Sequence, residues 1–275
     1  MRYFNYLTID LESWMFTGQY LKIDWKKRKE IDNGYVLRST EKILEILDKF
    51  DTKLTFFVLG ELYEWYPELI HRIFEKGHEI AYHTHSHELI NGKKSLEESF
   101  KQSREFLQEF HPLGFRAPNV HLPEIAISIL NNNNFIYDSS VYGLFSQNVR
   151  GIIEIPVFSY PIFRRKRVSN ISFPGHLTLR RVLTEIPIGS GYFLAILGKK
   201  VSYFIKKINE EGHPAVLFLH NWQIVKPEDA KLPKGMMNKL LEVPYTFEKL
   251  DLFIYLLKNF KIRPINKGIA AGDFC

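Results

Sequence analysis

The feature that most limits how this chain can fold is a regular alternation of strand-like and helix-like segments along its 275 residues. Apolar and aromatic runs predict strands at residues 3–9, 53–59, 78–82, 113–116, 135–137, 152–158, 215–219 and 261–265. Apolar residues at helical spacing predict helices at residues 40–50, 67–76, 96–110, 124–130, 198–211 and 247–260. This alternation predicts one α/β domain, residues 1–275, with a mainly parallel sheet.

Two stretches interrupt the alternation. Residues 13–35 mix aromatic and charged side chains without a clear period, which predicts a long loop over one end of the domain. Residues 160–191 are rich in Pro, Gly and Arg, which predicts a loop insertion. No linker of biased composition divides the chain, and an apolar fraction of 45% is enough for a large core.

Polar, titratable residues stand at or just past the carboxyl ends of five predicted strands. They are Asp10, His83, Arg116, Asp138 and His220. In a (β/α) barrel this edge is where catalytic groups gather. We therefore expect these five side chains to meet at one edge of the sheet.

The segment GHEIAYHTHSH carries histidines at alternate positions, His83, His85 and His87. If a helical turn begins at His83, then His83 and His87 share one face with Cβ atoms roughly 5–6 Å apart, and the pair can bind one metal ion. Extended backbone would instead place all three imidazoles on one face. A polar surface turn is the alternative for the pair taken alone.

Two carboxylates in LTIDLESW, Asp10 and Glu12, face the same side while the backbone is extended. A turn cap or an arginine partner is the simpler alternative for either carboxylate alone. Together with His83 and His87, Glu12 would complete the open three-ligand arrangement of catalytic zinc, which leaves one position for water. Asp10 would then act as the general base.

Other residues at the strand ends fit supporting roles. Arg116, in GFRAP, is suited to hold Asp10 as a bidentate partner, and the backbone N–H of Asn119 is suited to face the oxyanion of a tetrahedral intermediate. His220, in VLFLHNW, is suited to protonate the leaving group, because an imidazole titrates near neutrality. Asp138 is the candidate to orient that imidazole; a turn residue is its alternative.

Aromatic residues are abundant, and some of them are candidates for the wall of a sugar-binding pocket. These candidates are Trp222, Phe115, Tyr142, Tyr192 and Phe193. Ordinary core packing is the alternative for each ring.

The chain is basic, with a net charge of +6, and its charges cluster at Arg164–Arg167 and Arg180–Arg181. A solvated positive face explains these clusters most simply. A phosphate-bearing or acidic glycan partner and peripheral contact with an anionic membrane surface are the alternatives. No nucleic-acid-binding motif accompanies the charge, so we expect no nucleic-acid partner.

Cys275 is the only cysteine, which excludes an intramolecular disulfide. The first residues lack the apolar core and cleavage site of a secretory signal. No apolar run is long enough for a transmembrane segment, since the longest, residues 191–198, ends at Lys199. We therefore expect a cytoplasmic protein.

Taken in order, the motifs of this chain resemble those of the polysaccharide deacetylases, the NodB-like family 4 carbohydrate esterases. LTIDLES is similar to the first motif, LTFFVLG with GHEIAYHTHSH to the second, GFRAPN to the third and VLFLHNW to the fifth. The D-x-E spacing is similar to a subgroup that reads D-x-D or D-x-E-D. GSGYF and EIPVF resemble a subgroup associated with polysaccharide gene clusters.

The resemblance implies a distorted (β/α) barrel of about seven strands. It also implies a metal-dependent hydrolase that removes the N-acetyl group from an N-acetylated sugar or polysaccharide precursor, a non-peptide carbon–nitrogen bond. One divalent ion is implied, most often Zn²⁺, with Co²⁺, Mn²⁺ or Ni²⁺ as alternatives. By position, Asp10 is implied as the base, Glu12, His83 and His87 as the metal ligands, Arg116 as the partner of the base and His220 as the acid.

Three departures from the family pattern are visible. Glu12 stands where an aspartate is usual, and the fourth motif is unclear, so that Asp138 is carried over by position only. Asn221-Trp222-Gln223 follows His220 where the subgroup tends to have Pro-Trp-Glu. Two other functions fit the same residues: hydrolysis of a small cyclic amide or imide, as in allantoinases, and non-catalytic glycan binding by a barrel that has lost activity.

Overall fold

The computed structural model describes residues 3–14, 24–162, 171, 173–175, 178, 183–227 and 249–274. The strands are β1 (Phe4–Leu11), β2 (Thr55–Val58), β3 (Glu79–Tyr82), β4 (Gly114–Phe115), β5 (Tyr137–Asp138), β6 (Tyr142–Gly143), β7 (Gln147–Val149), β8 (Ile152–Glu154), β9 (Val157–Phe158), β10 (Tyr160–Pro161), β11 (Glu185–Ile186), β12 (Val216–His220) and β13 (Lys261–Ile262).

The α-helices are α1 (Trp25–Asp32), α2 (Tyr35–Lys49), α3 (Gly60–Trp65), α4 (Pro67–Glu75), α5 (Lys93–Gln102), α6 (Arg104–Phe110), α7 (Ile125–Asn132), α9 (Gly191–Leu197), α10 (Val201–Glu210), α11 (Asn221–Ile224), α13 (Leu250–Asn259) and α14 (Ile265–Ala270). Two short 3₁₀ turns are η3 (Pro118–Val120) and η4 (Gly198–Lys200).

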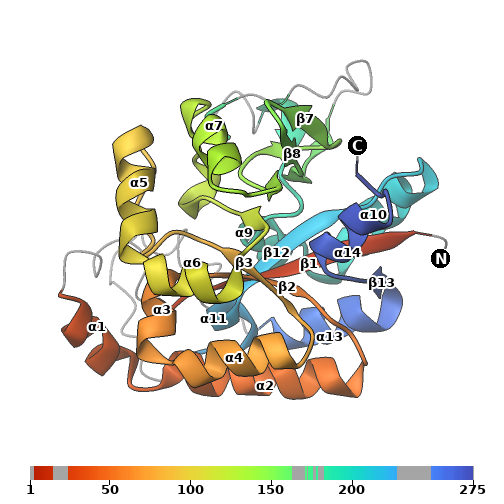
Figure 1. Ribbon diagram of the computed structural model, residues 1–275. Coiled ribbons are helices and arrows are strands. Elements are labelled where there is room, and N and C mark those ends of the chain that lie inside the picture. The colour runs from red at the N-terminus through yellow and green to blue at the C-terminus, as the bar shows by residue number, and fades with distance from the viewer. Residues whose placement is uncertain are drawn as a thin grey trace.

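A curved, mainly parallel sheet forms the centre of the molecule (Figure 1). Parallel pairing joins seven strands of the described chain in the order β12, β1, β2, β3, β4, β5 and β8. β7 then pairs antiparallel with β8, and β13 pairs with the start of β1. Because these seven strands are parallel, their carboxyl ends all meet at one edge.

Gly189 links the two ends of this row of parallel strands through hydrogen bonds. The N–H of Phe218 in β12 donates to the carbonyl of Gly189 at 2.8 Å, and the N–H of Gly189 donates to the carbonyl of Phe158 in β9 at 2.7 Å. β9 follows β8 directly along the chain. A Cβ on Gly189 would lie 2.4 Å from the carbonyl oxygen of Val216, so the close approach requires glycine. The sheet is thus curled into a distorted barrel.

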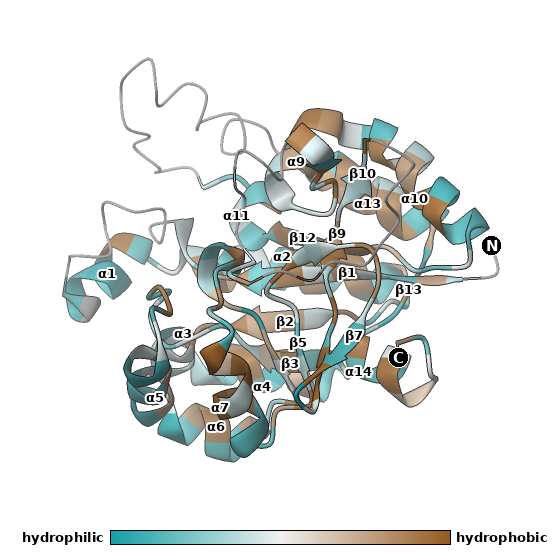
Figure 2. Ribbon diagram, turned by 90° about the horizontal axis from the view of Figure 1, so that it is seen from above, coloured by the Kyte–Doolittle hydropathy of each residue, from teal (hydrophilic) through white to brown (hydrophobic). Residues whose placement is uncertain are grey.

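Helices pack around the sheet and bury its apolar side chains. In Figure 1, α2, α4 and α13 lie on one side of the central strands, and α5 and α7 lie on the other. Figure 2 shows hydrophobic residues concentrated on β1 and β12, whereas α5 is mainly hydrophilic. Every residue of β1 after Phe4 is buried, which is the pattern of a strand covered on both faces. β1 is therefore a rigid support for the residues at its carboxyl end.

The structure confirms the predicted α/β class and the distorted (β/α) barrel. The predicted loop at 13–35 is partly wrong, because its last third forms α1; residues 15–23 lie outside the described part. The single predicted helix at 96–110 is two helices, α5 and α6. They separate at Ser103, whose hydroxyl accepts from Tyr82 Oη at 2.9 Å.

Much of the predicted insertion at 160–191 lies outside the described residues, as do both basic clusters of the sequence. Its described ends form the antiparallel pair of β10 and β11. None of the described helices combines the length and the hydropathy needed to cross a membrane.

Candidate metal centre and its surroundings

The carboxyl ends of β1 and β12 bring three candidate site residues together. Asp10 of β1 is paired in register with His220 of β12, and Glu12 follows at the end of β1. The backbone N–H of Glu12 donates to Asn221 Oδ1 at 3.2 Å, and Asn221 Nδ2 donates to Ser39 Oγ at 3.0 Å. These bonds fix the turn of the chain at Glu12. Asp10 and Glu12 are both at least 97% buried.

The histidine segment forms a tight loop after β3, neither the helical turn nor the extended strand that the spacing allowed. Thr84 and His87 adopt left-handed backbone conformations, with φ of 70° and 61°. Each such non-glycine residue costs about 1–2 kcal/mol. The N–H groups of Gly60 and Glu61 donate to the carbonyls of Thr84 and His85 and hold the loop in place. Strain at two positions of one loop is typical of a functional site.

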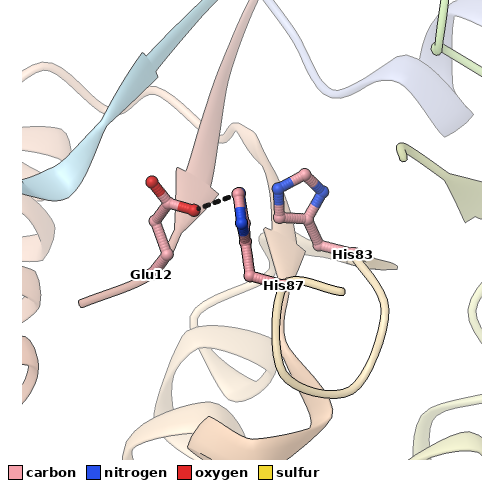
Figure 3. A group of neighbouring side chains, drawn as sticks. All are labelled: Glu12, His83 and His87. Carbon is pink, nitrogen blue, oxygen red and sulfur yellow. Dashed lines mark ion pairs between the residues drawn. The ribbon is translucent and has the colours of Figure 1, made fainter. Parts of the chain in front are cut away.

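This loop turns His87 back toward His83 and toward Glu12 (Figure 3). One ligand atom from each of Glu12, His83 and His87 lies within 4.8 Å of the others. His87 Nε2 is 3.0 Å from Glu12 Oε2. His85 is directed elsewhere, with its Nδ1 3.0 Å from Ser103 Oγ. The structure thus selects two of the three alternating histidines for this cluster.

The donor set fits a divalent metal ion. His83 Nδ1 lies 2.7 Å from the carbonyl oxygen of Arg116, so Nδ1 carries the hydrogen and Nε2 keeps its lone pair for a metal. Glu12 Oε2 is buried and faces His87 Nε2 as an ion pair, with no hydrogen bond from any other described residue. Two imidazoles and one carboxylate leave a fourth tetrahedral position for water or substrate. The residues therefore fit a catalytic rather than a structural site.

Electrostatics prepare these groups to bind a cation. Burial raises the pKa of Glu12, but the neighbouring His87 and His220 outweigh it and lower the pKa to about 2. Burial lowers the pKa of His83 to about 4. Burial also lowers the pKa of His87, but Glu12 beside it gives a net increase. At neutral pH the centre therefore holds an ionised carboxylate and a neutral His83, as a metal requires, whereas the raised pKa of His87 means that metal binding must displace its proton.

Arg116 holds Asp10 beside this cluster. Arg116 is fully buried, and its Nη1 donates to Asp10 Oδ1 at 2.6 Å and to Thr8 Oγ1 at 2.7 Å. Its Nε and Nη2 donate to the carbonyl and the hydroxyl of Ser139. The guanidinium also stacks over Phe57, 4.0 Å from the ring centre. The contact with Asp10 is through one nitrogen, not the bidentate pair that the sequence suggested.

Gln223 orients His220. Its Oε1 lies 2.9 Å from His220 Nδ1 and 3.1 Å from the backbone nitrogen of His220. Nδ1 therefore carries the hydrogen, and Nε2 faces the centre, 3.4 Å from Glu12 Oε1. Gly191 makes room for this arrangement, because a Cβ there would lie 2.3 Å from Gln223 Oε1.

The prediction that Asp138 orients His220 is wrong. Asp138 accepts from the hydroxyl of Ser140 at 2.6 Å and from its N–H at 3.0 Å. It also faces Glu154, its register partner across β5 and β8. Burial raises the pKa of Glu154, and Asp138 raises it further. Asp138 thus belongs to a buried carboxyl pair next to Ser139, the hydrogen-bond acceptor of Arg116.

Trp222 packs against the metal centre, and its place in a sugar-binding pocket stays a prediction. It is 5% exposed, stacks on His220 with ring centres 4.4 Å apart, and donates from Nε1 to Glu12 Oε1 at 2.9 Å. Phe115 is fully buried in the core, whereas Tyr192 and Phe193 are partly exposed at the start of α9. Tyr142 is also buried.

Asn119 lies in the turn η3 with a φ of 55°, and its oxyanion role stays a prediction.

Two residues at this centre, Gln223 and Asn221, were given no role by the sequence. A signal for Gln223 exists, since a glutamine three residues after a helix N-cap can accept from the N-cap backbone, as Gln223 Oε1 does from the N–H of His220. No sequence pattern indicated that Asn221 would reach the backbone of Glu12, a contact between residues 209 positions apart.

The geometry defines a class of protein: a distorted (β/α) barrel with a metal-binding cluster and acid–base groups at the carboxyl edge of its strands. The family model for polysaccharide deacetylases matches residues 30–136, which include both histidine ligands. Over these residues the chain is similar to the polysaccharide deacetylases.

Curated relatives match over short stretches. A peptidoglycan-N-acetylglucosamine deacetylase from Bacillus cereus is 38% identical over 79 residues, which cover 29% of this chain and 28% of that protein. A peptidoglycan-N-acetylmuramic acid deacetylase from Bacillus subtilis is 38% identical over 71 residues, 26% of this chain and 15% of that protein. The matched region spans less than a third of either relative.

Solved structures share the fold over nearly the whole chain. A structure from Mycobacterium smegmatis assigned to the polysaccharide deacetylases aligns with a TM-score of 0.52 at 18% identity, covering 96% of this chain and 94% of that one. The PuuE allantoinase aligns with a TM-score of 0.53 at 13% identity, covering 98% and 91%. At these identities the two structures establish the barrel alone.

Proposed function

We propose that this protein hydrolyses the N-acetyl group of an N-acetylated sugar or polysaccharide precursor, releasing acetate and a free amine. The observation that carries the proposal is the meeting of Glu12, His83 and His87 beside Asp10 and His220 at one edge of the barrel. The match to the polysaccharide deacetylases and the N-acetylated sugars named for the two Bacillus relatives support this substrate class.

Glu12, His83 and His87 would hold one divalent ion, for which we propose Zn²⁺; Co²⁺, Mn²⁺ and Ni²⁺ also suit two imidazoles and a carboxylate. When bound, such an ion polarises the acetyl carbonyl and lowers the pKa of water at its open position. Trp222 holds Glu12 from the opposite side through Oε1 and leaves Oε2 for the ion.

Asp10 is the proposed general base. Arg116 fixes its carboxylate at 2.6 Å and balances its charge in a buried site. Asp10 takes the proton from the attacking water, the new C–O bond forms, and the acetyl carbon becomes tetrahedral. The backbone N–H of Asn119 is the proposed additional donor to the oxyanion.

His220 is the proposed general acid. Because Gln223 accepts the hydrogen of Nδ1, Nε2 is the nitrogen that faces the centre and exchanges protons there. As the C–N bond breaks, Nε2 delivers a proton to the amine nitrogen of the sugar, and acetate leaves. The buried Asp138–Glu154 pair takes no part in this step.

An assay of the purified, zinc-loaded protein on N,N′-diacetylchitobiose and on N-acetylglucosamine tests the proposal. We expect acetate release in equal amount to new amine. Ring opening of allantoin without acetate release would assign the amide-hydrolase alternative. Sugar binding without turnover, unaffected by Asp10→Asn, would assign the glycan-binding alternative. Either result would refute deacetylation.

A further inference from the structure

A cavity of about 320 Å³ lies at the same edge of the barrel, between α1, the first turns of α2 and the chain that follows α11. Trp14, Tyr35 and Val225 give it an apolar wall. Arg38, Lys42 and Lys226 bring three cationic side chains to its rim. All three are exposed at the surface. The cavity thus joins an aromatic surface to a concentration of positive charge.

This cavity lies next to the metal centre, because its lining includes residues that are close to the centre in sequence or are hydrogen-bonded to it. Trp14 is two residues beyond Glu12, and two residues span at most about 7 Å. Ser39, which lines the cavity, accepts from Asn221, the residue that binds the backbone of Glu12. The cavity and the metal centre are therefore neighbours at one edge of the barrel.

The positive charge at the rim is largely uncompensated in the described part of the chain. Lys42 and Lys226 form no ion pair with any described carboxylate, and Arg38 donates to the backbone carbonyl of Asn33 at 2.7 Å. Arg38 and Lys42 are one helical turn apart and point to the same side of α2. Lys226 approaches from the segment after α11.

Asp32 is the acidic residue of the lining, but its carboxylate is engaged within the protein. It accepts from Ser13 Oγ at 2.7 Å, from Tyr66 Oη at 2.9 Å and from the N–H of Val36 at 3.2 Å. It is 1% exposed, and burial raises its pKa. Asp32 therefore offers little competition for the three cations at the rim.

We propose that this cavity binds the phosphate or diphosphate group of a phosphorylated N-acetylated sugar, whose acetyl group reaches the metal centre. The assignment rests on the proposed deacetylase function and narrows its substrate class. An arginine and two lysines around one cavity are the usual donors to phosphate oxygens. Trp14 and Tyr35 supply the flat apolar surface that suits a sugar or a base.

Kinetics with paired substrates test this assignment. The substrates are N-acetylglucosamine 1-phosphate and UDP-N-acetylglucosamine, each compared with neutral N,N′-diacetylchitobiose. In the double variant Lys42→Gln/Lys226→Gln, the ratio of kcat/KM for a phosphorylated substrate to that for chitobiose should fall about tenfold or more. A fall for both phosphorylated substrates indicates a phosphate site, and a larger fall for the nucleotide indicates a diphosphate site.

The control variant is Lys101→Gln/Lys258→Gln, which removes the same charge from exposed positions on α5 and α13. In this control variant the ratio of the two kcat/KM values should equal that of the wild-type protein. An unchanged ratio in the Lys42/Lys226 variant, or an equal fall in the control, would overturn the assignment.

A binding measurement separates this assignment from the proposed function. Calorimetric titration with inorganic pyrophosphate, in the His83→Ala background without metal, needs no turnover. The Lys42→Gln/Lys226→Gln substitutions should weaken that binding about tenfold or more. If the wild-type protein released no acetate and pyrophosphate binding still depended on these lysines, the function would be refuted and the phosphate site kept. Pyrophosphate binding that is unaffected by the two lysine substitutions would refute the phosphate site, whichever substrate the protein hydrolyses.

Discussion

Two buried glutamates at opposite edges of the barrel have opposite surroundings. Glu79 begins β3 at the amino edge and accepts from Thr55 Oγ1 at 2.6 Å, from Tyr137 Oη at 2.9 Å and from the N–H of Asn266 at 2.9 Å. Glu12 follows β1 at the carboxyl edge, where Oε1 accepts from Trp222 and Oε2 lies 3.0 Å from His87 Nε2 as an ion pair. The glutamate at the amino edge is fixed by neutral donors, whereas the glutamate at the carboxyl edge faces two imidazoles.

The difference shows that the two edges of the barrel serve different purposes. At the amino edge, polar groups satisfy one another and hold β2, β3, β5 and α14 together. At the carboxyl edge, potential metal ligands and strained backbone converge, which costs stability and prepares a site for a ligand. Variants at the two edges should therefore fail in different ways.

The largest expected effect is on turnover at the carboxyl edge. Asp10→Asn should lower kcat about 100- to 10,000-fold, because the amide cannot take the proton of water. Its metal content should match the wild-type protein, since Asp10 is outside the cluster of ligand atoms. Acetate release and elemental analysis measure the two quantities on one sample. Glu79→Gln is the control and should keep its activity. Full activity of Asp10→Asn would show that another residue is the general base.

At the amino edge, the expected loss is of folding stability. Glu79→Ala leaves the hydroxyls of Thr55 and Tyr137 and the N–H of Asn266 without their acceptor. At about 1 kcal/mol for each lost bond, the free energy of unfolding should fall by about 3 kcal/mol. Urea unfolding measures the fall. Metal retention in the folded variant should be unaffected, and its loss would mean that the two edges are coupled.

The two glutamates should also give opposite pH dependence in metal-free protein. The folded-state pKa of Glu12 is lowered from 4.5 to about 2, so the unfolded chain binds more protons between these values. Its stabilisation, about 3 kcal/mol, is present above about pH 4.5 and is lost as the pH falls toward 2. Burial raises the pKa of Glu79, so its contribution is full at acid pH and falls as the pH rises.

Unfolding of Glu12→Gln and Glu79→Gln from about pH 3 to about pH 7 checks these signs. The stability of wild type relative to Glu12→Gln should increase with pH, and that relative to Glu79→Gln should decrease. Slopes of the same sign would show that the surroundings of the two carboxylates are alike.

The smallest predicted effect concerns the orientation of His220. Gln223→Leu removes the acceptor of Nδ1 and should lower kcat/KM about tenfold, since about 1.4 kcal/mol of orientation is lost. Gln223→Glu keeps an acceptor oxygen and should recover most of the loss. The ¹⁵N chemical shifts of the His220 ring should show hydrogen on Nδ1 in wild type and a mixture of tautomers in Gln223→Leu. A His220 ring that stays in one tautomer in Gln223→Leu would show that Gln223 does not orient it.

The sequence predicted most of the framework because the framework is local. The buried strands β1, β2 and β12 are mainly apolar, and Asp10, His83 and His220 lie at or next to the carboxyl ends of β1, β3 and β12. Helix α1 was missed because its amphipathic pattern is weak. The break at Ser103 was missed because it depends on Tyr82, a contact from a distant strand.

The site was predicted less completely, since a strand end does not specify which neighbour a side chain meets. Asp138 stands at a strand end like Asp10, yet it meets Glu154 across the sheet and not His220. The selection of His83 and His87 over His85 depends on left-handed backbone at Thr84 and His87, which neither residue type indicates. The role of Gln223 follows a local capping pattern and was available from the sequence.

The central claim is that Glu12, His83 and His87 hold one metal ion. Elemental analysis of the purified protein, after exchange into metal-free buffer, tests it directly and without a known substrate. The claim predicts about one divalent ion per chain in wild type and in Glu79→Gln, and close to none in His83→Ala. Wild-type protein that retains no ion after incubation with Zn²⁺, or His83→Ala that retains as much as wild type, would contradict it.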